Sequence, residues 1–228
     1  SAPALQCGDD PEDLSLTGEP MVGGVPVGAS PECEIAVAFT DQIINHCLPA
    51  AYTVVRTWTT IDFCNGTVSS RVQLIKVEDK VAPVLTAPAD VTIGTDGFTC
   101  TGSLTLPQAS ATDNCSAINI VPHWQFGSGY GPFSSIPLGT HIVTYTATDG
   151  CGNSSTATMQ VSVEDTGPPQ AICSSDLQVS LSASGGAYLN AATIGVNSSD
   201  NCSGPVSLDI SRDAENYAAQ LLFTCDDI

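Results

Sequence analysis

The chain has 228 residues, with five Lys and Arg against 24 Asp and Glu, and a formal net charge of −19. A surface this negative repels nucleic-acid phosphates and anionic lipid headgroups, which excludes nucleic-acid binding and electrostatic membrane attachment as leading functions. No stretch reaches the roughly 18 apolar residues of a membrane span, so we expect no direct membrane insertion in this segment. The hydrophobic share of 42% is enough for packed cores.

The ten cysteines stand singly along the chain, without the CxxC spacing of zinc ribbons or thioredoxin-like motifs. Such spacing is typical of disulfide-bonded secreted domains, so we predict an extracellular location. The first residues lack the basic end and apolar core of a signal peptide, and residues 221–228 are a strand-like run that is largely apolar up to Cys225. We therefore expect a segment of a longer exported polypeptide.

Three motifs recur along the chain at a nearly constant offset. Residues 57–66 recur as 144–153, Val77-Glu78-Asp79 recurs as Val163-Glu164-Asp165, and Asp113-Asn114-Cys115 recurs as Asp200-Asn201-Cys202, at offsets of 86 or 87 residues. The agreement predicts three repeats: a first repeat over residues 1–79, a second over 80–165 and a third, expected to be truncated, over 166–228.

Within each repeat the dominant pattern is period-2 alternation between turn residues, which is typical of strands with one buried face. It predicts that Val143, Tyr145 and Ala147 face a core, and the same alternation predicts strands over residues 103–106 and 177–181. No segment has a helical apolar stripe. Short strands every 8 to 12 residues in a repeat of about 85 residues predict an all-β fold of tandem immunoglobulin-like antiparallel β-sandwich modules, arranged end to end.

The second repeat resembles a hyalin-repeat (HYR) module in residues 111–115, 137–140, 143–153 and 163–165. In the first repeat, residues 56–58 leading to 62–64 resemble the companion module of giant Bacteroidetes surface adhesins, which are similar to the gliding-motility adhesins exported by the type IX route. Two departures are Ser30-Pro31-Glu32-Cys33 in place of Asp-Asn-Cys, and Met159 where such repeats often carry a cysteine. The resemblance implies cell-surface attachment, with gliding motility as one setting.

We expect the loop cysteines to pair within each repeat. The predicted pairs are Cys33–Cys64, Cys115–Cys151 and Cys202–Cys225, with Cys7–Cys47 completing the first repeat, although four cysteines allow three connectivities. Cys173 most simply pairs with a residue after position 228. Cys100 has no obvious partner, and a Cys100–Cys173 bridge across the repeat junction is the alternative.

Carboxylates and amides gather where one repeat is expected to meet the next. Glu78 and Asp79 are predicted to approach Asp113, Asn114 and Asp149, and Glu164 and Asp165 to approach Asp200 and Asn201. Calcium takes six to eight oxygen ligands of these kinds, so we predict structural calcium ions that stiffen the junctions, in the manner of cadherin-like linkers. The alternative is that these aspartates and asparagines only form turns with their own backbone.

Catalytic motifs are missing from the sequence. The three histidines have no zinc-ligand spacing, and there is no G-x-S-x-G elbow or Walker sequence, so we predict no enzyme activity. The predicted function is a non-catalytic stalk in a long extracellular adhesin. Its partners would be neighbouring repeats and an unidentified surface glycan or protein. Two alternatives stay open: a carbohydrate-binding array beside a secreted hydrolase, for which Trp124 and Tyr130 are candidate contacts, and a self-assembling extracellular filament.

Overall fold

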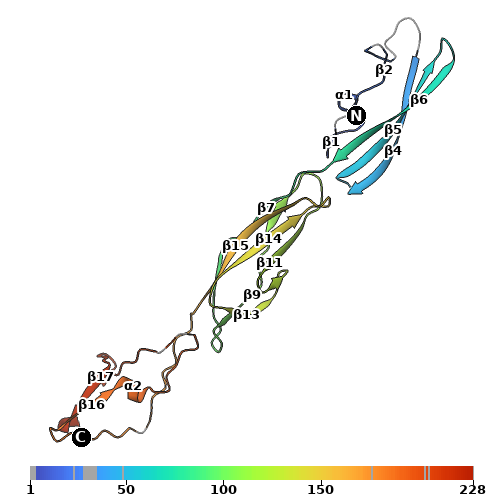
Figure 1. Cartoon of the computed structure of the whole chain (residues 1–228). Coiled ribbons are helices and arrows are strands. Elements are labelled where there is room, and N and C mark those ends of the chain that lie inside the picture. Colours follow the sequence, from blue (N-terminus) through green and yellow to red (C-terminus); the bar gives the residue numbers. More distant parts are fainter. Residues whose placement is uncertain are drawn as a thin grey trace. The chain divides into compact units, whose positions relative to one another are not determined.

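The computed structural model describes residues 4–22, 24–27, 35–47, 49–175, 177–202, 204 and 206–227. Within these residues the only helices are α1 (Leu14–Thr17), α2 (Ala191–Ile194) and the 3₁₀ turn η1 (Cys225–Asp227), and strands dominate the rest (Figure 1). The predicted all-β fold class is confirmed. None of the helices in this part of the chain has the length and apolar character needed to cross a membrane.

The residues gather into two compact units. Unit 1 comprises Ser1–Ala89, Pro107–Tyr130 and Val143–Met159, and unit 2 comprises Asp90–Leu106, Gly131–Ile142 and Gln160–Ile228. Each unit contains one of the two predicted repeat boundaries, after residue 79 in unit 1 and after residue 165 in unit 2. The division into three repeats stays a prediction.

The first repeat is built on one four-stranded sheet in unit 1, with strand order β1-β6-β5-β4. The strands are β1 (Leu5–Gln6), β4 (Ile35–Cys47), β5 (Ala51–Asp62) and β6 (Thr67–Glu78), and a short hairpin of β2 (Met21–Val22) and β3 (Val25–Pro26) lies outside this sheet. The long strands pair antiparallel, whereas β1 pairs in parallel with the end of β6, Leu5 opposite Val77. Leu5, Val54, Ile75 and Val77 form the buried core of this sheet.

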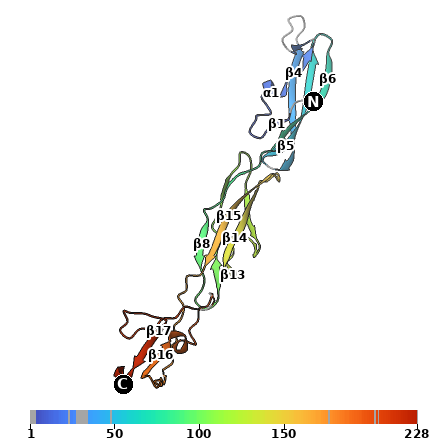
Figure 2. The ribbon, with the colours of Figure 1, turned by 60° about the vertical axis from the view of Figure 1, so that its left-hand side comes forward.

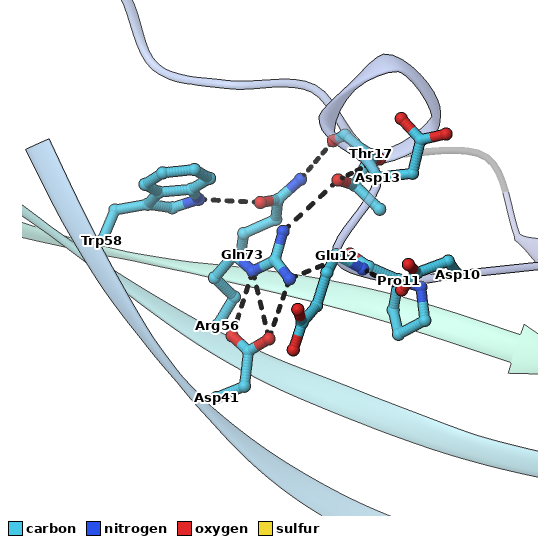
Figure 3. A network of polar contacts seen from close by, with 9 residues as sticks. All are labelled: Asp10, Pro11, Glu12, Asp13, Thr17, Asp41, Arg56, Trp58 and Gln73. Carbon is cyan, nitrogen blue, oxygen red and sulfur yellow. Dashed lines mark hydrogen bonds and ion pairs between the residues drawn. The ribbon is translucent and has the colours of Figure 1, made fainter.

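A buried arginine joins the segment around α1 to the face of this sheet (Figure 3). Arg56, on β5, is fully buried and forms a bidentate ion pair with Asp41 on β4, with N–O distances of 3.0 and 2.8 Å. Its guanidinium also donates to the Pro11 carbonyl at 2.8 Å and to the Thr17 hydroxyl at 3.3 Å. Burial of a charge is tolerated only when it is paired and hydrogen-bonded in this way. Arg56 therefore fixes the segment that contains Pro11 and Thr17 to the sheet of the first repeat.

The second repeat contributes strands of two separate sheets to unit 1. One sheet contains, in order, β12 (Gly127–Ser128), β11 (Asn119–Trp124), β14 (Gly139–Thr148) and β15 (Ser154–Glu164), and the other pairs β7 (Val84–Thr86) with β10 (Ser110–Thr112). Val143, Tyr145 and Ala147 are all fully buried, as predicted. The Tyr145 hydroxyl donates to the Pro107 carbonyl at 2.8 Å, and burial raises its pKa to about 12.

Matching turns connect the last two strands of the first and second repeats. Gly66 follows Asp62 between β5 and β6, and Gly152 follows Asp149 between β14 and β15. Both glycines have a positive φ, 71° and 93°, which other residues adopt only with strain. In both repeats the recurring Asp-x-Cys motif therefore forms the loop between the last two strands, and Val-Glu-Asp stands at the end of the last strand.

Unit 2 holds β8 (Val91–Gly94), which pairs in parallel with residues 161–164 at the end of β15, also in unit 2 (Figure 2). It also holds the antiparallel pair of β9 (Thr101–Leu104) and β13 (Phe133–Pro137). In the third repeat β16 (Gly186–Asn190) pairs antiparallel with β17 (Gln220–Thr224). Leu106, Ile136, Val161 and Val163 are buried in this unit. The prediction of a strand over residues 177–181 is wrong: the backbone there pairs with no neighbouring strand, and Val179 is 37% exposed. Alternation alone cannot supply the partner that a strand needs.

Candidate functional site

Three of the predicted junction residues come together in unit 1. Asp79 follows β6, Asp113 follows β10 and Asp149 opens the loop between β14 and β15. One carboxylate oxygen from each lies within 4.8 Å of those of the other two. At such a separation each pair of charges repels by roughly 3 kcal/mol at an effective dielectric of about 20. The fold therefore concentrates negative charge between residues of the first and second repeats.

Each of these carboxylates also shapes its own loop. Asp113 Oδ1 accepts from the backbone N–H groups of Cys115 and Ser116, both at 2.9 Å. Asp79 Oδ1 accepts from the Val81 N–H at 3.2 Å. The turn-forming role that the sequence offered as an alternative is thus present at these positions, and it leaves the second oxygen of each of the two carboxylates for another partner.

Asp149 accepts more hydrogen bonds than the other two. Its Oδ1 accepts from the backbone N–H groups of Cys151 and Asn153, at 2.9 and 2.8 Å, and its Oδ2 accepts from the Asn153 side chain at 2.7 Å. Burial alone raises the pKa of Asp149, but these hydrogen bonds outweigh it and hold the pKa below its ordinary value. The carboxylate is therefore fixed in its charged form, although only 7% of the residue is exposed.

The asparagine and glutamate predicted for this junction have other partners. Asn114 donates from its side-chain nitrogen to the sulfurs of Cys7 and Cys115, at 3.1 and 2.6 Å. Glu78 forms an ion pair with Lys80, and the hydrogen bond from Lys80 lowers its pKa. Asn153 is not among the predicted junction residues, but its side chain donates to the Asp79 carbonyl at 3.1 Å and so links the two repeats.

At the junction in unit 2, Asp165 and Asp200 come together with the sulfur of Cys202. Asp165 is exposed and Asp200 is half-buried. Their Oδ1 atoms accept from the N–H groups of Gly167 and Cys202, at 3.1 and 2.8 Å. Asn201 donates from its side chain to the carbonyls of Asp96 and Thr99, at 2.9 and 3.2 Å. Glu164 is exposed at the end of β15.

Disulfides cross both predicted junctions, and most of the predicted pairing is wrong. The bridges are Cys7–Cys115, Cys47–Cys151 and Cys100–Cys202, with Cα–Cα distances of 5.9, 5.1 and 4.7 Å. They replace the predicted Cys7–Cys47, Cys115–Cys151 and Cys202–Cys225, and Cys225 and Cys173 are unpaired. Cys64 is disulfide-bonded, and its predicted partner Cys33 lies outside the described residues.

The strand topology explains the pairing at the first junction. Because β1 runs parallel to the end of β6, the Cys7 N–H donates to the Glu78 carbonyl at 3.2 Å, which places Cys7 beside the loop that carries Cys115. Cys47 ends β4 at the same boundary and meets the loop that carries Cys151. Cys100 does bridge a junction, as the alternative proposed, but to Cys202 and not to Cys173.

The aromatic residues considered for sugar binding are largely inside the fold. Trp124 is 4% exposed and packs edge-on against Phe126 at a centroid distance of 4.9 Å, and Trp58 is 7% exposed. Tyr130 is half-buried. The two tryptophans therefore offer no exposed platform for a sugar ring.

The fold and the junctions define an all-β segment whose predicted repeats are joined by disulfides. No protein-family model matches the chain. It is 33% identical over 151 residues to Hyalin of Lytechinus variegatus, covering 63% of this chain and 26% of that protein. It is 32% identical over 106 residues to the rat (Rattus norvegicus) sushi, von Willebrand factor type A, EGF and pentraxin domain-containing protein 1, covering 46% of this chain and 3% of that protein.

Among solved structures, the fibronectin(III)-like modules of Clostridium thermocellum CbhA align with a TM-score of 0.28 and 18% identity, covering 57% of this chain and 77% of that one. The chain thus spans between 3% and 26% of the two protein relatives. The sequence similarity supports a hyalin-like repeat module.

Proposed function

We propose that this chain is a non-catalytic stalk segment of a long extracellular adhesive protein, which carries tension between an anchor and a ligand-binding part. The observation that carries the proposal is the set of three disulfides that each join one repeat to the next. A disulfide within a repeat limits the extension under force of that repeat alone. A bridge between repeats transmits force from one to the next through covalent bonds.

The three closed loops overlap along the sequence, and this overlap limits how far the chain can extend. A force applied from Cys7 to Cys202 passes through the Cys7–Cys115 bridge, back along the chain to Cys100, and through the Cys100–Cys202 bridge. Only the segment from Cys100 to Cys115, which spans 15 peptide bonds, lies on this path outside the bridges. The rest of the chain between the outer cysteines is shielded from the load.

The extracellular setting is supported by the chemistry of the chain. Disulfides form and persist in oxidising compartments, and three are present among the described residues. The similarity to Hyalin supports an adhesive repeat role. For the particular setting we propose the surface of a gliding bacterium with type IX export, and this is supported by the resemblance of residues 56–58 and 62–64 to adhesin modules.

The proposal is tested by pulling the oxidised chain from its two ends in a single-molecule force experiment. At about 3.5 Å per residue step, the region from Cys7 to Cys202 should extend to roughly 50 Å, because only the segment from Cys100 to Cys115 can unravel. The same region in the variant Cys100→Ser with Cys202→Ser should extend several-fold further. An oxidised wild-type chain that extends by several hundred ångströms would show that the bridges do not carry the load.

A further inference from the structure

Two carboxylate oxygens at the first junction are buried without a hydrogen-bond partner. They are Asp79 Oδ2 and Asp113 Oδ2. Asp79 is only 7% exposed, and its Oδ2 belongs to the carboxylate that faces Asp113 and Asp149. A buried charged oxygen without a partner is strongly unfavourable, and two further carboxylates close by make it more so. A positively charged partner would resolve both problems at once.

We propose that Asp79, Asp113 and Asp149 together bind one calcium ion. Their oxygens are close enough to share one ion, within 4.8 Å of one another, and they come from three separate loops. The backbone hydrogen bonds to Asp79 and Asp113 use Oδ1 and leave Oδ2 available. Asp149 Oδ1 already accepts two hydrogen bonds, but Oδ2 accepts only the one from the Asn153 side chain and keeps a second lone pair for a metal.

The ligand chemistry favours calcium over softer metals. The sulfurs of Cys7 and Cys115 lie near Asp79, but they are joined in a disulfide and offer no thiolate. The cluster that remains contains only oxygen donors, which suit hard cations. Magnesium demands a tight octahedron, whereas calcium accepts an irregular set completed by waters and carbonyls. With three protein carboxylates, a Kd of about 10⁻⁴ to 10⁻³ M is expected, typical of extracellular modules.

The ion would form a link between repeats that the disulfides do not supply. Asp79 belongs to the first repeat, and Asp113 and Asp149 belong to the second. The bridges Cys7–Cys115 and Cys47–Cys151 hold the backbone of the two repeats together at this boundary. The ion would cancel the electrostatic repulsion between the three carboxylates that lie there. Binding can be measured on the chain itself, so its failure would leave the proposed stalk function untouched.

The first measurement is calorimetric titration of the oxidised chain with calcium chloride after treatment with a chelator, followed by thermal melts. One calcium ion should bind at this cluster, with a rise in Tm of roughly 5 °C at saturating calcium. Magnesium chloride should give a much smaller rise. No heat of binding and no change in Tm at about 10 mM calcium, ten times the weakest expected Kd, would overturn the proposal.

Asp79→Asn gives the sharper test, because the two roles of Asp79 predict different results. The asparagine keeps the Oδ1 acceptor for the Val81 N–H, so the turn survives. In chelator the variant should be as stable as the wild type or more so, since one charge of the cluster is gone. With calcium it should lose the rise in Tm, and Asp113→Asn should behave in the same way.

Asp62→Asn is the matched control. Asp62 stands 87 residues before Asp149, in the equivalent turn, and accepts from the Cys64 N–H at 2.8 Å. Its substitution should leave the response to calcium intact. If Asp79→Asn keeps the full response, or if Asp62→Asn loses it equally, the cluster is not the site, and the two buried oxygens are satisfied by water.

Discussion

The two repeat junctions use the same motif in different ways. At the first, Asp113-Asn114-Cys115 lies beside two disulfides, and Asp113 faces two largely buried carboxylates. At the second, Asp200-Asn201-Cys202 lies beside one disulfide, and Asp200 faces one exposed carboxylate, that of Asp165. In both, the motif's cysteine bridges back to the preceding repeat, across sequence separations of 108 and 102 residues. The bridge is therefore the shared element, and the charge cluster belongs to the first junction.

The difference follows from single residues. The second bridge of the first junction uses Cys47, and the residue 87 positions later is Ser134, which cannot form a disulfide. The asparagines also differ in what they hold: Asn114 donates to the disulfide sulfurs, whereas Asn201 donates to the carbonyls of Asp96 and Thr99. At the second junction, hydrogen bonds from Asn201 to backbone carbonyls hold the loop, where the first junction has a second disulfide. We therefore expect the first junction to be the stiffer of the two.

Removal of the disulfides should have the largest effect on the free energy of unfolding, and the effect should differ between the two junctions. Chain entropy predicts about 4–5 kcal/mol for one bridge that closes a loop of roughly 100 residues, and overlapping loops give less than the sum. Replacing all four cysteines of the first junction by serine should lower the free energy of unfolding by more than Cys100→Ser with Cys202→Ser does. Urea unfolding of the two variants measures the difference.

Proteolytic cleavage provides a check that does not depend on stability. A protease site placed in residues 80–83 should, after cleavage, leave two fragments that separate on a denaturing gel only under reducing conditions. The four-cysteine variant should give separate fragments without reductant. Separation of the wild-type fragments without reductant would contradict the bridges Cys7–Cys115 and Cys47–Cys151.

The two paired arginines offer a second comparison, with a smaller expected effect. Arg56 is fully buried, and its partner Asp41 has a side chain 21% exposed. Arg212 pairs with Asp227, but its own side chain is 44% exposed. Arg56→Ala leaves buried partners unsatisfied and should cost about 3 kcal/mol, whereas Arg212→Ala should cost less than about 1 kcal/mol. If urea unfolding shows that both variants lose the same free energy of unfolding, the buried contacts of Arg56 do not stabilise the first repeat.

Much of the fold could be predicted from the sequence because it depends on local patterns. Alternation placed Val143, Tyr145 and Ala147 in a core, and the recurring turn motifs marked the strand exits that bring Asp79, Asp113 and Asp149 together. The same pattern failed at residues 177–181, where no partner strand is present. Local patterns therefore predict which side chains are buried better than they predict which strands pair.

The predicted disulfide map is wrong because it pairs cysteines within each repeat, whereas the bridges join one repeat to the next. The parallel pairing of β1 with β6 places Cys7 at the junction, and alternation cannot reveal strand order. One signal is present in the sequence: the separations of Cys7 from Cys115 and of Cys100 from Cys202 are similar, 108 and 102 residues, and both exceed one repeat period. The burial of Arg56 had no local signal, because its acceptors are distant in sequence, as far as Pro11.

The smallest predicted effect concerns the loop that fixes Asp149, and the size of this effect depends on pH. The hydrogen bonds hold the pKa of Asp149 below its ordinary value. Their contribution to stability is therefore present above the pKa of the unfolded chain, about 4, and is lost as the pH falls through the folded-state pKa. Asn153→Ala removes the side-chain donor, so the pKa of Asp149 should rise toward its ordinary value.

In chelator at pH 6, Asn153→Ala should be less stable than the wild type by roughly 1 kcal/mol, because one hydrogen bond to a charged group is lost. As the pH falls through the folded-state pKa of Asp149 the difference should shrink, since the carboxylate becomes protonated in both proteins. Ser154→Ala, at the next and exposed position, is the control and should match the wild type over this pH range. A difference that stays constant with pH would mean that Asn153 acts through its bond to the Asp79 carbonyl. The first junction would then owe its order to a contact between backbone and side chain that needs no charge on Asp149.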